Sequence, residues 1–175
     1  MEMMGTDKPI KVFLDSSVLR VLTLGNEKLS YLLVWPILGC PIQVVLSSYT
    51  LSETLAALAE KNVPPKARIA VVKGLSMGLS QSGWHVHLPE PDPAQVQAMA
   101  RYCRDQNDWP VLADALAEEC SFLVTTDKDL LDLGAEEPIS CMRPETLQVL
   151  LENDPAIQRI LQSIVDSFGP SSPIP

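Results

Sequence analysis

Four acidic residues fall where apolar segments of the chain end or where helices are expected to begin: Asp15, Glu53, Asp108 and Asp127. Asp15 closes the run Lys-Val-Phe-Leu, and Asp127 closes Phe-Leu-Val-Thr-Thr. In a parallel α/β sheet the carboxyl ends of the strands share one edge, where ligands bind. Carboxylates that gather repel one another, so such a group needs a counter-charge. Because a hard divalent cation such as Mg2+ prefers oxygen ligands, the pattern predicts a metal site.

Each of the four acids also has a purely structural explanation. Asp15 and Asp108 suit the first positions of helices, and Asp127 suits the turn Thr-Thr-Asp-Lys-Asp. Thr50-Leu-Ser-Glu53 fits a capping box, which predicts that a helix begins after Thr50. The coincidence of all four at one expected edge favours a shared site over four independent caps.

Three further aspartates lie close to these acids in the chain. Asp129 follows Asp127 by two residues and can either add an oxygen ligand to a metal or cap a short helix. Asp105 is an alternative to Asp108 as the third acidic position. Asp114 follows Asp108 by six residues, a helical rotation of about 600°. We therefore expect Asp114 to point elsewhere, in a structural or rim role.

Alternating strands and helices must position these acids. Strands are expected at residues 11–14, 42–46, 84–88, 122–125 and 139–142. Helices are expected from residue 16 and at 27–35, 50–61, 64–79, 94–104, 108–119, 129–133, 145–151 and 155–168, with Pro36 ending the second. This alternation predicts an α/β fold with a parallel sheet covered on both faces. We expect one domain, with its main body at 1–150 and a helical extension with a frayed tail at 151–175.

The charge balance argues against a general nucleic-acid-binding protein, because the net charge is −9. Residues 11–80 nevertheless carry more basic than acidic side chains. Lys66 and Lys73 are seven residues apart and share a helix face, so they, Arg68 and Arg20 are candidates for phosphate contacts. A solvated basic helix without such contacts explains the same pattern.

Composition limits the class of protein further. The mean hydropathy of +0.12 indicates a folded core rather than a disordered acidic chain. The four cysteines form no Cys-x-x-Cys pair, and His85 and His87 have no third clustered ligand nearby, which argues against zinc. The chain start lacks a basic segment followed by an apolar one, and the apolar stretch 32–46 is interrupted by Pro36, Gly39 and Pro41. We therefore expect a cytoplasmic protein that does not enter the membrane.

The acidic segments together resemble the PIN-domain family of metal-dependent nucleases. The matching segments are Val-Phe-Leu-Asp-Ser-Ser-Val-Leu (12–19), Thr-Leu-Ser-Glu-Thr-Leu (50–55), Asp-Trp-Pro-Val-Leu-Ala-Asp-Ala-Leu-Ala (108–117) and Phe-Leu-Val-Thr-Thr-Asp-Lys-Asp-Leu-Leu (122–131). The resemblance implies a three-layer α/β/α sandwich around a four- or five-stranded parallel sheet. It also implies that Asp15, Glu53, Asp108 and Asp127 form the acidic quartet of the family.

The function implied by the resemblance is that of a VapC-like ribonuclease. The quartet, with Asp129, would hold Mg2+ or Mn2+ for cleavage of single-stranded RNA. An antitoxin protein or a second copy of the chain would be the partner, bound by the leucine-rich C-terminal helices, unless these helices only cover the sheet.

Two alternative functions stay open. One is a PIN-like interaction module without activity, and the other is a phosphotransfer enzyme with a catalytic Asp15. Ser17 stands where haloacid-dehalogenase-type phosphatases need a second aspartate.

Overall fold

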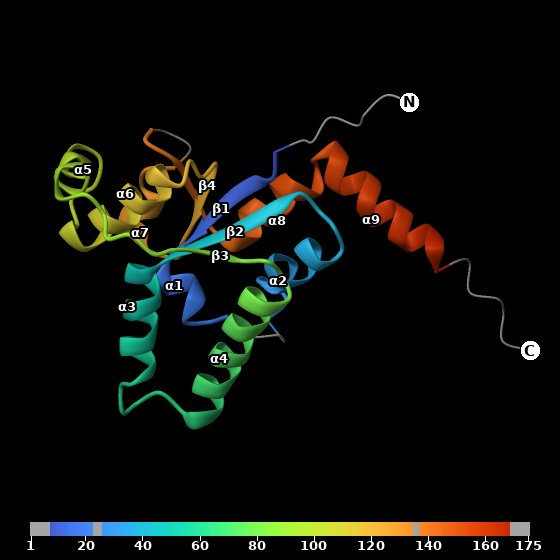
Figure 1. The fold of residues 1–175 in the computed structure, drawn as a ribbon, viewed down its shortest axis with the longest axis horizontal. Helices are drawn as coiled ribbons and strands as arrows, with labels where there is room; N and C mark the ends of the chain where they lie inside the picture. Colours follow the sequence, from blue (N-terminus) through green and yellow to red (C-terminus); the bar gives the residue numbers. More distant parts are fainter. Residues whose placement is uncertain (1–7, 23–25, 135–136, 169–175) are drawn as a thin grey trace, which may run out of the picture.

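A five-stranded parallel sheet forms the centre of the protein (Figure 1). The computed structural model describes residues 8–22, 26–134 and 137–168. The strands are β1 (Ile10–Leu14), β2 (Ile42–Ser47), β3 (His85–His87), β4 (Phe122–Val124) and β5 (Ser140–Met142), in the order β3-β2-β1-β4-β5. Every neighbouring pair is parallel, so the predicted α/β fold with a parallel sheet is confirmed.

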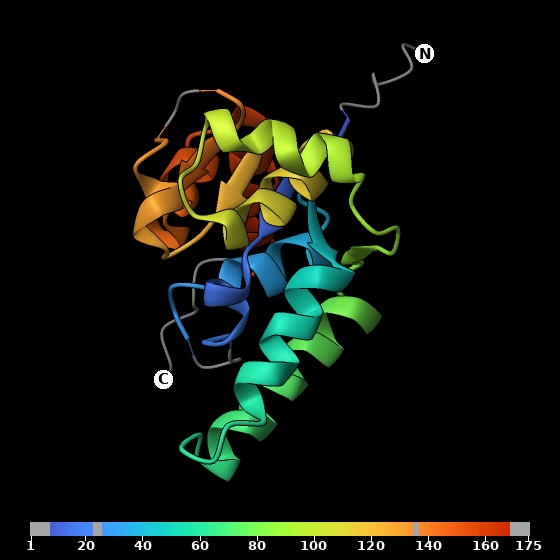
Figure 2. The ribbon, with the colours of Figure 1, turned by 90° about the vertical axis from the view of Figure 1, so that its left-hand side faces the viewer.

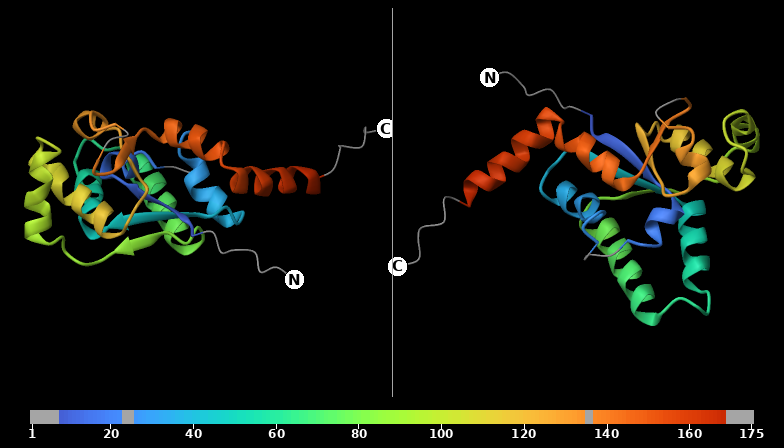
Figure 3. Two further views of the ribbon diagram at one scale, coloured as in Figure 1. Left: turned by 90° about the horizontal axis from the view of Figure 1, so that it is seen from above. Right: turned by 180° about the vertical axis from the view of Figure 1, so that it is seen from behind.

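Helices connect the strands and cover both faces of the sheet. They are α1 (Ser16–Leu19), α2 (Ser30–Ile37), α3 (Ser48–Leu58), α4 (Pro65–Ser80), α5 (Pro93–Ala98), α6 (Trp109–Ala117), α7 (Lys128–Leu131), α8 (Pro144–Glu152) and α9 (Pro155–Ser167). Helices α3 and α4 form a hairpin that extends away from the sheet (Figure 2). Helix α9 also extends from the body, towards the C-terminus (Figure 3). Among the described helices, none is long and apolar enough to cross a bilayer.

The two faces of the sheet bury separate clusters of side chains, as the alternation of side chains along a strand requires. Leu14 of β1 packs in a cluster with Leu32 of α2 and Leu147 of α8. Its neighbour Phe13 packs on the other face with Leu112 of α6. All five side chains are fully buried. The predicted three-layer sandwich is therefore confirmed, with α2, α4 and α8 on one face and α5, α6 and α7 on the other.

Helix α2 does not end before Pro36 as predicted, because Pro36 lies inside the helix. A proline in a helix leaves the carbonyl four residues earlier without its helical partner. That carbonyl belongs to Leu32, and the indole Nε1–H of Trp84 donates a hydrogen bond to it at 3.0 Å. The long-range hydrogen bond replaces the missing helical one, so the helix continues to Ile37.

The predicted helices at 94–104 and 108–119 are shorter than expected. The first is α5 followed by the 3-10 helix η1 (Met99–Arg101), and the second is the 3-10 helix η2 (Gln106–Asp108) followed by α6. The Asp105 carboxylate accepts the Asn107 N–H at 2.9 Å and so caps η2. The loop between η1 and η2 carries Asp105 to the acidic group described below. The frayed tail predicted at the C-terminus falls on residues 169–175, which lie outside the described residues.

Candidate metal centre

Asp15 and Asp127 stand at the carboxyl ends of neighbouring strands, β1 and β4. The backbone N–H of Asp15 donates to the carbonyl of Val124 at 3.0 Å, which joins the two strand ends. Asp15 Oδ1 accepts the Ser16 N–H at 2.7 Å and caps α1. Asp127 Oδ1 accepts the Asp129 N–H at 2.8 Å and caps α7. Capping therefore accounts for one oxygen of each carboxylate.

Two hydroxyl groups fix the second oxygen of Asp15 and tie the two loops together. Ser17 Oγ and Thr125 Oγ1 donate to Asp15 Oδ2 at 2.6 and 2.8 Å. In turn, the Thr126 N–H donates to Ser17 Oγ at 3.0 Å and the Asp127 N–H donates to Thr125 Oγ1 at 2.9 Å. The Asp15 side chain is buried, so this network holds it in one orientation.

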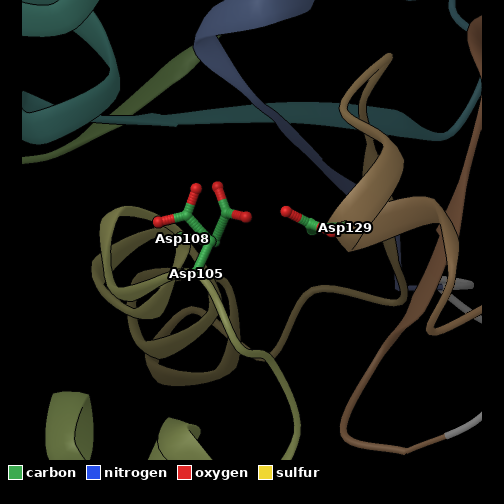
Figure 4. A group of neighbouring side chains, drawn as sticks. All are labelled: Asp105, Asp108 and Asp129. Carbon is green, nitrogen blue, oxygen red and sulfur yellow. The ribbon is translucent and has the colours of Figure 1, made fainter.

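The tightest group of carboxylates consists of Asp105, Asp108 and Asp129 (Figure 4). Each offers one oxygen, and these oxygens all lie within 4.8 Å of one another. Asp105 precedes η2 and Asp108 is its last residue, whereas Asp129 belongs to α7. Figure 4 shows the three side chains converging across the space between the two elements. Asp105 therefore stands beside Asp108 rather than in its place.

The electrostatics of Asp108 connect this group with the two strand-end aspartates. Asp108 is 8% exposed, and the pKa of its carboxyl is raised to about 7. Burial is the largest cause, followed by the charges of Asp127, Asp105 and Asp15, in that order. A hydrogen bond from Cys103 Sγ to Asp108 Oδ2, at 3.6 Å, acts in the opposite direction. A group of only oxygen donors under mutual repulsion fits a hard divalent cation.

Glu53 does not take part in a capping box, so that prediction is wrong. Strand β2 leads directly into α3 at Ser48, and Ser47 is the N-cap. The Thr50 N–H donates to Ser47 Oγ at 3.2 Å, and the Ser47 N–H donates to Thr50 Oγ1 at 3.1 Å. The capping box thus consists of Ser47 and Thr50, three residues earlier than predicted. Glu53 lies in the second turn of α3, where capping does not explain its charge.

Tyr49 is the common neighbour of Glu53 and of the group formed by Asp105, Asp108 and Asp129, called the aspartate group below. The pKa of the Tyr49 phenol is raised to about 12, mainly by burial and then by the charges of Glu53, Asp108 and Asp105. The phenol Oη–H donates to the Asn107 carbonyl at 3.2 Å. Glu53 is not a member of the tightest carboxylate group, and Tyr49 is what connects it with Asp108 and Asp105. Sequence patterns carried no signal for Tyr49.

Asp114 is not part of this group and is buried, so of the two predicted roles, structural or rim, the structural one agrees with its position. Its side chain is 1% exposed, and burial raises the pKa of its carboxyl. The nearby Ser47 hydroxyl and the charge of His87, whose Nε2 lies 3.9 Å from Oδ1, offset part of this rise in pKa, but neither Asp114 oxygen forms a hydrogen bond with a described residue. His87 Nδ1 and His85 Nε2 contact Glu118 Oε1 at 2.6 and 3.4 Å. The histidines therefore meet carboxylates of α6 and its C-terminal end.

The basic residues predicted to contact RNA are dispersed. Arg20 donates to the carbonyl and the hydroxyl of Ser16 at 3.3 and 3.4 Å, so it lies beside the residue that follows Asp15. Arg68 donates to two backbone carbonyls of the α3–α4 turn, which is a structural role. Lys66 and Lys73 are exposed on α4, and this helix starts at the end of the hairpin remote from the sheet (Figure 2).

The fold and the acidic group define an α/β protein with a candidate divalent-cation centre at the carboxyl edge of a parallel sheet. The profile of the PIN domain matches residues 11–129, more than half of the chain. The protein belongs to the PIN-domain family. The four cysteines of the chain are free and buried.

Two solved structures are similar in fold. One is PAE2754 from Pyrobaculum aerophilum, with 18% sequence identity and a TM-score of 0.50 over 83% of this chain and 99% of that chain. The other is a member of the VapBC family of toxin-antitoxin systems, VapBC-5, from Mycobacterium tuberculosis, with 19% identity and a TM-score of 0.48 over 77% and 99%. None of the curated protein sequences compared with the chain matches it.

Proposed function

We propose that the protein is a ribonuclease that depends on Mg2+ or Mn2+ and cleaves single-stranded RNA at the acidic group. The observation that carries the proposal is the convergence of Asp105, Asp108 and Asp129, with the charges of Asp127 and Asp15 also acting on Asp108. Among the described residues, no basic side chain forms an ion pair with these aspartates. A bound cation would supply the missing counter-charge. Membership of the PIN-domain family supports the proposal, because PIN domains are generally nucleases.

Five aspartates would hold the cation: Asp15, Asp105, Asp108, Asp127 and Asp129. Glu53 would contribute directly or through water. The cation would supply activation of a water molecule and neutralisation of charge on the phosphodiester. Ser17 and Thr125 keep the Asp15 carboxylate in one orientation, which reduces the cost of ordering it around a ligand. The protein therefore needs no nucleophilic side chain of its own.

The test is cleavage of single-stranded RNA by the full chain in Mg2+, in Mn2+ and in excess chelator. We expect metal-dependent cleavage that falls about 100-fold or more in Asp15→Asn and in Asp108→Asn. Asp166→Asn is the matched control, because Asp166 is exposed on α9 and lies outside the group. Cleavage in excess chelator, or full activity of Asp15→Asn, would contradict the proposal.

The same assay separates the alternative functions. Binding of Mn2+ without any cleavage of RNA would favour a PIN-like interaction module. Trapping of a phosphoaspartate at Asp15 would favour a phosphotransfer enzyme. Glu53→Gln, compared with Glu60→Gln just beyond α3, tests whether the outlying carboxylate contributes to cleavage.

The proposal extends to a cytoplasmic toxin of a toxin–antitoxin pair, with the nuclease domain at residues 1–150 and residues 151–175 as its extension. The antitoxin, or a second copy of the chain, would cover the apolar face of α9. Val165 is 63% exposed and the adjoining Phe168 is 83% exposed. Co-expression with the product of an adjacent small reading frame should give a stable complex, and the Val165→Ser variant should weaken it. A chain that neither binds such a product nor self-associates would contradict this role.

A further inference from the structure

A polar cavity of about 270 Å³ adjoins the aspartate group. The residues around it come from the loop between η1 and η2 and from α7 with the residues that follow it: Tyr102, Cys103, Arg104, Asp129, Asp132 and Leu133. Asp129 belongs both to this lining and to the tightest group of carboxylates. The cavity and the candidate metal centre therefore share a wall.

The loop that forms this wall is firmly anchored. The Cys103 N–H donates to the Met99 carbonyl at 3.1 Å, and the Cys103 carbonyl accepts the Trp109 indole N–H at 2.8 Å. The Cys103 side chain is buried in the core on this face of the sheet. Tyr102 and Arg104, on either side of it, line the cavity. The loop that supplies Asp105 thus also holds an aromatic ring and a guanidinium group in place.

Two arginines lie next to Tyr102: Arg104 lines the cavity, together with Asp129 and Asp132, and Arg101 lies against the Tyr102 ring. The Arg101 guanidinium carbon lies 4.6 Å from the centroid of the Tyr102 ring, within the range of a cation–π contact. Arg101 and Arg104 are exposed, and neither forms an ion pair with a described residue. Guanidinium groups bind phosphate through paired N–H donors. Aromatic rings and guanidinium planes stack with unpaired bases of single-stranded RNA.

We propose that this cavity is a nucleotide subsite for single-stranded RNA. Arg104 and Arg101 bind a phosphate next to the cleaved bond, and the cavity beside Tyr102 receives the base of that nucleotide. This inference rests on the proposed ribonuclease function. The volume is near the lower end of ligand pockets, about 300 Å³, so it suits one planar group. A base within a duplex would first have to leave its stack, so the subsite selects single strands.

The test measures the affinity of the full chain for a fluorescently labelled single-stranded oligoribonucleotide at several salt concentrations. Ca2+ replaces Mg2+ in this assay, and a gel checks that the RNA stays intact. We expect Arg104→Met to weaken binding about 10-fold, because a charge-assisted hydrogen bond to phosphate is lost. The slope of log affinity against log salt should fall by about 0.7, the value for one phosphate contact to a single strand. Arg159→Met on α9 removes the same charge at a remote place and should change neither quantity.

A second pair of variants tests the ring. Tyr102→Ala should weaken single-strand binding about 10-fold, whereas Tyr102→Phe, which keeps the stacking surface, should stay close to wild type. Duplex RNA should bind about 10-fold more weakly than single strands and should not respond to Tyr102→Ala. Equal behaviour of Arg104→Met and Arg159→Met, or equal affinity for duplex and single strands, would overturn the subsite. If the wild type cleaves RNA but the variants do not weaken binding as expected, only the nucleotide subsite is wrong. If the wild type neither binds nor cleaves RNA, the subsite and the ribonuclease function are both wrong.

Discussion

Replacement of Asp108 by asparagine should stabilise the metal-free protein. The pKa of the Asp108 carboxyl is raised from 3.8 to about 7 by burial and by the charges of Asp127, Asp105 and Asp15. A shift of roughly three pKa units corresponds to about 4 kcal/mol of cost for the ionised form. Asparagine has a similar shape and no charge, so the Asp108→Asn variant avoids this cost.

The pH dependence of this effect has a definite sign. Between pH 3.8 and about 7 the folded protein holds more protons on Asp108 than the unfolded chain does. The free energy of unfolding therefore falls as the pH rises through this window, and the full cost is present only above pH 7. We expect the stability advantage of Asp108→Asn over wild type to be about 2–3 kcal/mol larger at pH 8 than at pH 5.

Urea unfolding of both proteins in excess chelator at pH 5 and pH 8 measures this difference, with Asp132→Asn as the exposed control. Saturating Mn2+ at pH 8 should then stabilise the wild type by about 3 kcal/mol at 100 times its dissociation constant, and the Asp108→Asn variant by less. Equal stability of Asp108→Asn and wild type at pH 8 in chelator would refute this account of Asp108.

Three further substitutions test the fold by urea unfolding. Asp114→Asn should raise stability more at pH 8 than at pH 5, because burial raises the pKa of Asp114 and its ionised form has no hydrogen-bond partner among the described residues. Gly78→Ala should lower stability by about 1–3 kcal/mol, since a Cβ atom there collides with the indole ring of Trp84. Ser47→Ala should cost about 1 kcal/mol, because it removes the oxygen that accepts the Thr50 N–H.

Exposed positions on the same helices provide controls for two of these substitutions. Ser76→Ala on α4 and Ser52→Ala on α3 should leave the free energy of unfolding within about 0.5 kcal/mol of wild type. Gly78→Ala or Ser47→Ala with the same small effect as its control would contradict the packing or capping assigned here. An Asp114→Asn variant less stable than wild type at pH 8 would contradict the cost assigned to its buried charge.

The strands were predictable because short apolar runs such as residues 42–46 are buried on both faces of a parallel sheet. Helix ends depended on partners distant in the sequence. Pro36 remains inside α2 because the Trp84 indole donates a hydrogen bond to the carbonyl of Leu32. A local sequence pattern does not predict a contact between residues so far apart in the chain. The start of α3 was missed because Ser47 both ends a strand and caps a helix.

The general place of the acidic site was predictable, because strand ends share one edge of a parallel sheet. Which residues form the site was less predictable. Asp105 and Asp108 were treated as alternatives, yet η2 brings both to Asp129. The distance of Glu53 from this group, with Tyr49 as their common neighbour, depends on how α3 packs beside η2. Such packing follows from tertiary structure rather than from spacing in the chain.

The most direct test of the divalent-cation site is calorimetric titration of Mn2+ into the metal-free full chain and into Asp108→Asn. The aspartate group is expected to bind Mn2+ in the wild type, with release of protons near pH 7 as Asp108 ionises. The Asp108→Asn variant should bind at least about 10-fold more weakly, and Asp166→Asn, which changes an exposed residue of α9, should bind like wild type. Equal affinity of Asp108→Asn and wild type for Mn2+, or no binding by the wild type, would contradict the assignment of this group as the metal centre.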